Sequence, residues 1–180
     1  MADKPSYLGL LNAIAVGEGR AYTLLDAWAK ATPDAAVAAV LNLVAIRERE
    51  HAAAFTKRLC ELGFGIKVAP RGDFDVKLEF VRSDAGDRDK FESVLGYGKT
   101  ERPDDPLAAV FSDQSIDVQT GELLGRYIAE ERDSERRLRE CYSSLGKEKE
   151  TPADQALAEI CARLERLTAS IEELKSLRRH

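Results

Sequence analysis

Apolar side chains recur at three- and four-residue intervals in four separate stretches of the chain, a pattern that predicts amphipathic helices. The spacing places these helices over about residues 6–30, 32–62, 117 or 120 to 145, and 151–174. The second helix should open at Thr32-Pro33-Asp34, with the Thr32 hydroxyl as its cap and Pro33 in the first helical position, and should stop at Gly63. The fourth should open at Thr151 with the same Thr-Pro signal.

Each predicted helix carries one apolar face that should enter a common core. The predicted core positions are Leu8, Leu11, Ala15, Glu18, Tyr22, Leu25 and Ala29 in the first helix; Leu41, Val44, Glu48, His51, Phe55, Leu59 and Leu62 in the second; Leu124, Tyr127, Glu131, Ser134, Leu138, Cys141 and Leu145 in the third; and Leu157, Ile160, Leu164, Leu167, Ile171 and Leu174 in the fourth. A pair of such helices cannot bury its apolar faces alone, so two helical hairpins should pack together. The predicted fold is therefore all-α, an antiparallel four-helix bundle with residues 1–180 in a single domain.

The helical pattern is interrupted between about residues 63 and 113. This insertion holds six of the twelve glycines and three of the six prolines, a composition typical of a long connection. Lys77 to Val81 alternates and predicts a short strand or an extended segment, while Asp87–Leu95 and Pro106–Phe111 each suggest a helical turn or two. The insertion is long enough to serve as one long crossover between the second and third helices.

Ionisable residues stand at core positions in three of the four apolar faces. Glu18 lies between Leu11 and Leu25, Glu131 lies in the equivalent place on the third helix, and Glu48 and His51 share one face of the second. An isolated carboxylate in an apolar interior costs several kcal/mol or more. Carboxylates from three helices are tolerated only if something positive lies among them, and a metal ion or a buried arginine would serve.

The first half of the chain resembles rubrerythrin and the wider ferritin-like superfamily. The segments LLNAIAVGEGRAYTLL and VLNLVAIREREHAAAF carry this resemblance, which covers about residues 7–62. It implies a ferritin-like bundle in which Glu18 is the metal ligand of the first helix and Glu48 and His51 form the Glu-x-x-His pair of the second. In that family the site holds two irons, or iron with manganese, that react with oxygen or peroxide.

The second half departs from the family pattern. Glu131 fits the third-helix ligand, with Glu130 as the neighbouring alternative, but the fourth helix has no Glu-x-x-His. One register offers Glu165 and Thr168 in its place, and another offers Leu167 and Ser170. The resemblance therefore implies a reduced site of Glu18, Glu48, His51 and Glu131, which would hold one ion or a weakly bound pair of iron, manganese or zinc.

Composition and charge limit the kinds of partner and the location that we expect for this protein. The net charge of −5 and the absence of a long basic block argue against nucleic acid, and no apolar run reaches the ~20 residues of a membrane span. We expect a cytoplasmic protein with reduced thiols, since the three cysteines are widely spaced. The chain lacks the four-cysteine iron module of rubrerythrin, so redox turnover would need an external reductant. Ferritin-like bundles commonly pair, which implies a homodimer.

Two readings without metal stay open from the sequence. In the first, the bundle is a metal-free relic that serves in interaction, assembly or stress, with its carboxylates paired to arginines. The candidate arginines are Arg20, Arg47, Arg126 and Arg132. In the second, the protein is a helical bundle unrelated to ferritins.

Overall fold

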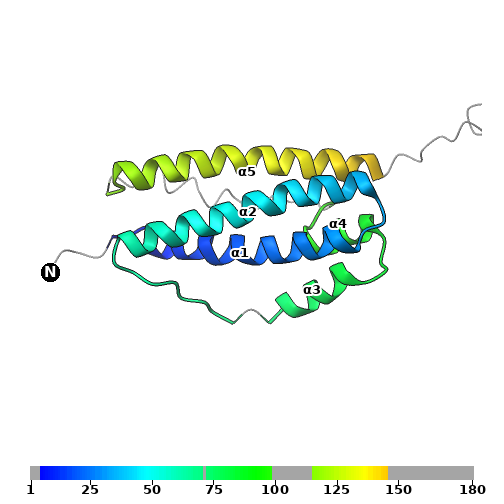
Figure 1. Ribbon diagram of the computed structural model, residues 1–180, viewed down its shortest axis with the longest axis horizontal. Helices are drawn as coiled ribbons and strands as arrows, with labels where there is room; N and C mark the ends of the chain where they lie inside the picture. Colours follow the sequence, from blue (N-terminus) through cyan, green and yellow to red (C-terminus); the bar gives the residue numbers. More distant parts are fainter. Residues whose placement is uncertain (1–4, 71, 99–114, 146–180) are drawn as a thin grey trace, which may run out of the picture. The chain divides into compact units, whose positions relative to one another are not determined.

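The computed structural model describes residues 5–70, 72–98 and 115–145 (Figure 1). The described part is all-helical, which confirms the predicted fold class at that level. It contains α1 (Leu8–Ala31), α2 (Ala35–Glu61), α3 (Phe74–Arg82), α4 (Asp87–Val94) and α5 (Val118–Leu145). The predicted fourth helix, with Glu165 and Thr168, and the predicted turns at Pro106–Phe111 lie outside the described residues. No helix in the described ranges combines the length and apolarity needed to cross a membrane.

The turn between α1 and α2 is held by two neighbouring polar side chains. The cap of α2 is Asp34, whose carboxylate accepts from the amides of Ala36 and Val37, and not Thr32 as predicted. Thr32 instead follows the end of α1, where its hydroxyl accepts from the Asp34 amide. The reason is that a carboxylate directly after Pro33 reaches the two free amides of the first turn more easily than a hydroxyl two residues earlier.

Gly63 ends α2 as its sequence predicts. It adopts φ of 83°, a conformation that costs glycine nothing. Its amide donates to Cys60 O, and the amide of Phe64 donates back to Leu59 O at 2.9 Å. These two bonds form the Schellman motif, which satisfies carbonyls that the helix end would otherwise leave free.

Side-chain pairs give the directions of the three long helices. Along α2 and α5, Arg58 meets Asp117 while Arg47 meets Asp133, so these helices are antiparallel. α1 and α5 are parallel, because Tyr7 contacts Asp117 and Glu18 contacts Tyr127. α1 and α2 are antiparallel, as a short turn between consecutive helices requires (Figure 1).

This arrangement corrects the prediction of one long crossover. A single crossover along the bundle would start the third helix at the end opposite to the end of α2, and α5 would then be parallel to α2. Instead α5 begins beside the end of α2, where Arg58 binds Asp117. The insertion does travel to the other end, since Asp87 at the start of α4 accepts hydrogen bonds from Trp28 and Thr32. The next described residues, from Ser115 onward, are back at the end where the insertion began.

The predicted strand at Lys77–Val81 is wrong, because these residues belong to α3. Phe74, Leu78 and Val81 recur at helical spacing, and this face packs on α1 while Val81 is fully buried. The short alternation in KLEFV cannot outweigh a longer apolar face. The predicted turns at Asp87–Leu95 are confirmed as α4, which places Phe91 edge-on against Trp28 with ring centroids 4.8 Å apart.

The core of the three long helices consists of two separate apolar clusters. One joins the end of α1 to the start of α2 and the end of α5, around Trp28, Leu41 and Leu138. The other joins the opposite ends of the same helices, around Leu11, Phe55 and Leu124. The middle of the bundle, between these clusters, is where the ionisable core positions lie. Nearly all predicted core positions of the three described helices are buried; Tyr22, Leu62, Glu131 and Leu145 are partly exposed.

Candidate metal centre

Glu18, Glu48, His51 and Glu131 converge in the middle of the bundle. Each offers one oxygen or nitrogen atom, and these four atoms all lie within 4.8 Å of one another. The exposed fractions of Glu18, Glu48 and His51 are only 8%, 5% and 5%. The Glu131 side chain, at 32%, is partly open to solvent. The sequence therefore predicted the convergence of all four residues, which come from α1, α2 and α5.

The four residues share one level because of helical spacing. Glu48 and His51 are three residues apart on α2 and so project from the same face. Glu18 stands at the middle of α1, opposite Tyr127 of α5, and Glu131 is four residues further along the face that carries Tyr127. The apolar clusters on either side exclude water from this level along the helix axes.

The two ring nitrogens of His51 face different surroundings. Nε2 lies 2.7 Å from Glu130 Oε2, on the outer side of the cluster. Nδ1 faces inward and lies 3.4 Å from Glu131 Oε1. Among the described residues, neither Nδ1 nor that oxygen has a hydrogen-bond partner, although both are buried. Buried polar atoms of this kind are rare and indicate a missing ligand or a functional role.

Tyr127 supplies the one hydroxyl of the cluster. It donates a 2.8 Å hydrogen bond to Glu18 Oε1 and stands edge-on to the ring of His51. Burial, with the nearby carboxylates, raises the pKa of Tyr127, so the phenol keeps its proton and remains a donor. Tyr127 thus occupies the core position that its spacing predicts. Tyr22, the tyrosine core position predicted in the first helix, is only partly buried and lies under the guanidinium of Arg49.

The crowding of acids in a buried space shifts the pKa values of Glu18 and His51. Burial, together with repulsion from Glu131, raises the pKa of Glu18 from 4.5 to about 7, despite the hydrogen bond from Tyr127. Burial lowers the pKa of His51, but the carboxylates of Glu131 and Glu130 outweigh it and the net shift is upward. Burial therefore acts in opposite directions on the two groups, while the neighbouring carboxylates raise the pKa of both.

The arginines proposed as counter-ions bind elsewhere. Arg20 donates to the carbonyl of Ala69, and Arg47 binds Asp133 at 2.7 Å. Arg126 donates to Glu130, which is not one of the four cluster residues, and Arg132 is exposed. Within the described residues, the positive group that the sequence required among the carboxylates is therefore not one of these arginines.

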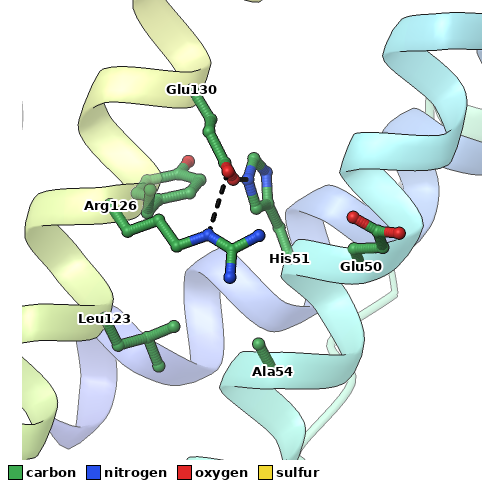
Figure 2. Close-up of a pocket in the computed structure, with 7 residues that line it drawn as sticks. Glu50, His51, Ala54, Leu123, Arg126 and Glu130 are labelled. Atoms are coloured by element: carbon green, nitrogen blue, oxygen red, sulfur yellow. Dashed lines mark hydrogen bonds and ion pairs between the residues drawn. The ribbon is translucent and has the colours of Figure 1, made fainter.

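A pocket of about 330 Å³ opens beside the cluster, between α2 and α5. Figure 2 shows Glu130 reaching from α5 between His51 and Arg126, with Leu123 and Ala54 below them. His51 lines this pocket with its Nε2 side and faces the cluster with its Nδ1 side. The imidazole therefore separates the pocket from the cluster.

Glu130 is the residue whose position the sequence left open. It stood only as the alternative to Glu131, because two adjacent glutamates cannot both lie on the same helical face. In the structure Glu131 faces inward and Glu130 contacts the outer nitrogen of His51. The signal in the sequence was the spacing of Arg126 and Glu130, four residues apart, which places an anchoring guanidinium beside the carboxylate.

Comparison with known proteins gives this chain no relative. No protein-family model, no curated protein and no solved structure matches it.

Proposed function

We propose that this protein binds a first-row transition metal through Glu18, Glu48, His51 and Glu131, and that it handles iron, oxygen or peroxide. The observation that carries the proposal is the convergence of one imidazole and three carboxylates, within 4.8 Å, between two apolar clusters. Imidazole and carboxylate together suit iron, manganese and zinc, and an incomplete ligand set leaves positions open for a small reactant. One ion, or a weakly bound pair, fits a set of four residues.

Two features of the cluster support a cation as its missing component. The inward Nδ1 of His51 and Oε1 of Glu131 lack hydrogen-bond partners among the described residues, and both atoms are of the types that bind metals. Burial, and after it the neighbouring Glu131 carboxylate, raise the pKa of Glu18, as expected for acids that share a poorly hydrated space without a counter-charge. A divalent ion at this point would satisfy the unpaired atoms and offset the charge.

Each residue of the cluster would have its own role in the proposed chemistry. When bound, an iron or manganese ion would supply electron transfer to oxygen or peroxide. Glu18, Glu48 and Glu131 would hold the ion, His51 would complete the ligand set, and Tyr127 would hold one oxygen of Glu18 in place. The partly open Glu131 marks the side from which a small molecule reaches the cluster. Redox turnover would use an external reductant.

A relationship to rubrerythrin remains part of this proposal. The first two helices support it, because Glu18, Glu48 and His51 occupy the positions that the resemblance assigned to them. The direction of α5 does not support this relationship. A single crossover would make α5 parallel to α2, whereas α5 is antiparallel to α2. The chemistry of the centre therefore rests on the four side chains and not on the family.

Metal content provides the test. The purified protein, loaded anaerobically with iron or manganese and then desalted, should retain at least about half an equivalent by elemental analysis. Glu48→Ala and His51→Ala should each lose most of it. Glu50→Ala is the matched control, since Glu50 lies on the same helix two residues away but is exposed. Retention below about a tenth of an equivalent in the wild-type protein would overturn the proposal.

The second candidate is a metal-free bundle that serves in interaction or assembly. Its supporting observation is that protons can offset part of the negative charge: with a pKa of about 7, Glu18 is about half protonated at neutral pH, and His51 pairs with Glu130. We propose a homodimer on this reading as well. Light scattering would give the mass of the assembly. On this reading, Glu48→Ala and His51→Ala would change neither that mass nor the binding of a partner.

A further inference from the structure

We infer that Glu130 is a positioning residue, which fixes the tautomer and ring orientation of His51 so that Nδ1 presents its lone pair to the metal. This inference rests on the proposed metal site and adds to it a residue that is not itself a ligand. It would make the centre a combination of four ligands and one outer carboxylate. Outer carboxylates of this kind raise the basicity of a metal-binding histidine and hold its ring in place.

The first step of the argument concerns the proton on His51. Glu130 Oε2 lies 2.7 Å from Nε2, and an ionised carboxylate can only accept a hydrogen bond. Nε2 must therefore carry the proton. When the imidazole is neutral, Nδ1 is then unprotonated, and it is Nδ1 that faces the other cluster residues, 3.4 Å from Glu131 Oε1.

The second step concerns the charge on Glu130. The guanidinium of Arg126, which cannot lose its proton in a protein, lies directly beside Glu130 and favours the ionised carboxylate. Arg126 Nε donates to Oε1 at 2.9 Å, so the two oxygens of Glu130 serve two different donors. Glu130 thus stays ionised and is held in one orientation between Arg126 and His51 (Figure 2).

The third step concerns the orientation of the ring. The imidazole of His51 meets Tyr127 edge-on, with ring centroids 5.0 Å apart and an interplanar angle of 83°. Glu130 contacts the outer edge of the same ring. Rotation of the imidazole by half a turn would replace Nε2 with a ring carbon and break the bond to Glu130, so the carboxylate keeps Nδ1, and not Cδ2, pointing inward.

An ordinary surface ion pair does not account for this arrangement. α5 carries a second pair with the same spacing, Arg136 and Glu140, in which the donor nitrogen also lies 2.9 Å from the carboxylate. The Glu140 side chain is 65% exposed, whereas that of Glu130 is 30% exposed and its second oxygen is used by a buried imidazole. The two pairs differ in the histidine, which makes Glu140 a close control for Glu130.

The first test measures binding of Co²⁺ alone to the full chain by calorimetric titration. Glu130→Ala should weaken binding by about 10- to 100-fold, the usual effect of losing an outer carboxylate. Glu140→Ala should bind as the wild-type protein does. Equal affinities for the two variants would overturn the inference. Thermal unfolding of both variants without metal checks that each remains folded. Glu130→Ala should lose more stability than Glu140→Ala, because it also removes the bond to the buried His51.

The second test reads the tautomer directly and needs no metal. The chain has two histidines, so His180→Gln leaves His51 as the source of ring signals. Nitrogen NMR of metal-free protein, at a pH where His51 is neutral, should show a slowly exchanging proton on Nε2 and none on Nδ1. Glu130→Ala should lose that protected proton, and Glu140→Ala should keep it. A proton on Nδ1 in the His180→Gln background would overturn the inference.

The two tests separate this inference from the proposed function. If the wild-type protein takes up no Co²⁺, iron or manganese, the metal site itself fails. If it binds metal, but Glu130→Ala binds equally well and keeps the Nε2 proton, the metal site stands and the role of Glu130 fails.

Discussion

Tyr127 of α5 donates a 2.8 Å hydrogen bond to Glu18 of α1, two helices whose side chains otherwise meet mainly through apolar contacts. The bond places a neutral phenol against a buried carboxylate. The middle of the bundle is therefore held by polar contacts that a purely apolar core would not need, and their removal should be measurable.

Tyr127→Phe should destabilise the protein by about 1.5–3 kcal/mol, because it removes a hydrogen bond to a buried acid and leaves that acid without the donor. It should also raise the pKa of Glu18 further above 7, since this hydrogen bond opposes the effect of burial. Urea unfolding and carboxyl NMR titration measure the two effects. Tyr142→Phe is the control: its hydroxyl bonds Glu92 near the surface, and its loss should cost clearly less than the loss of the Tyr127 hydroxyl. Equal losses for the two variants would contradict this account.

Glu18→Gln should change how the stability of the metal-free protein depends on pH. The folded pKa of Glu18 is about 7, above the ordinary 4.5, so the folded state resists ionisation. The favourable contribution is present below about pH 4.5 and is lost as the pH rises to about 7. Glutamine cannot ionise, so the variant should exceed the wild-type protein by on the order of 2–3 kcal/mol above neutral pH and match it in acid. Unfolding at several pH values in the presence of a chelator measures the difference. A difference that stays constant with pH would rule out this cause.

Asp117→Asn should weaken the end of the bundle where α2 meets α5. Arg58 is 9% exposed and binds Asp117 Oδ1 at 2.8 Å, while Tyr7 donates to Oδ2. Burial raises the pKa of Asp117, but hydrogen bonds from the hydroxyl and amide of Thr120, together with those from Tyr7 and Arg58, hold it well below its usual range. The stabilisation is present above the ordinary pKa and is lost as the pH falls below about 4. Asparagine can still accept the hydrogen bond from the Thr120 amide at the start of α5. The loss of unfolding free energy at neutral pH, about 1–3 kcal/mol, therefore measures the contribution of the negative charge of Asp117.

The control for Asp117→Asn is Glu79→Gln. Glu79 pairs with Arg82 on the surface of α3, and the two side chains are 75% and 53% exposed. Its loss should change the free energy of unfolding by less than about 0.5 kcal/mol, both at neutral pH and below about pH 4. If Asp117→Asn and Glu79→Gln lose the same amount, the buried guanidinium does not stabilise the junction as we describe.

Gly98→Ala should cost about 1–2 kcal/mol. Gly98 has φ of 82°, which disfavours any side chain, and an added Cβ would lie 3.3 Å from the Tyr142 hydroxyl. Gly65→Ala is the control, since Gly65 has no positive φ and its Cβ would meet no atom within 4 Å. Thermal unfolding compares the two variants. A loss at Gly65 as large as that at Gly98 would show that the cost lies in the loss of glycine itself.

The sequence predicted the long helices well because the pattern of three- and four-residue intervals reports burial directly. It placed Leu11, Leu41, Phe55 and Leu124 in the core, where each is almost fully buried. It could not give the direction of α5, because an amphipathic face has the same spacing read from either end. The strand prediction failed for a related reason: five residues are too few to separate an alternating pattern from a helical one.

The site followed from the same pattern, with one exception. An ionisable residue in an apolar face must find compensation, and this identified Glu18, Glu48, His51 and Glu131 together. Glu130 stands outside the apolar face, so its contact with His51 depends on the distance between α2 and α5, which the spacing of one helix does not contain. Its importance became visible only with both helices in place.

Arg58 binds Glu61 at the last turn of α2 and Asp117 just before α5, so the polypeptide between these two acids makes a detour that returns to its point of departure. Val81 and Phe91 of this segment are fully buried in the same core as Trp28, so the detour also seals one end of the long helices. Insertions and deletions in this segment should therefore be tolerated outside α3 and α4 and not within them.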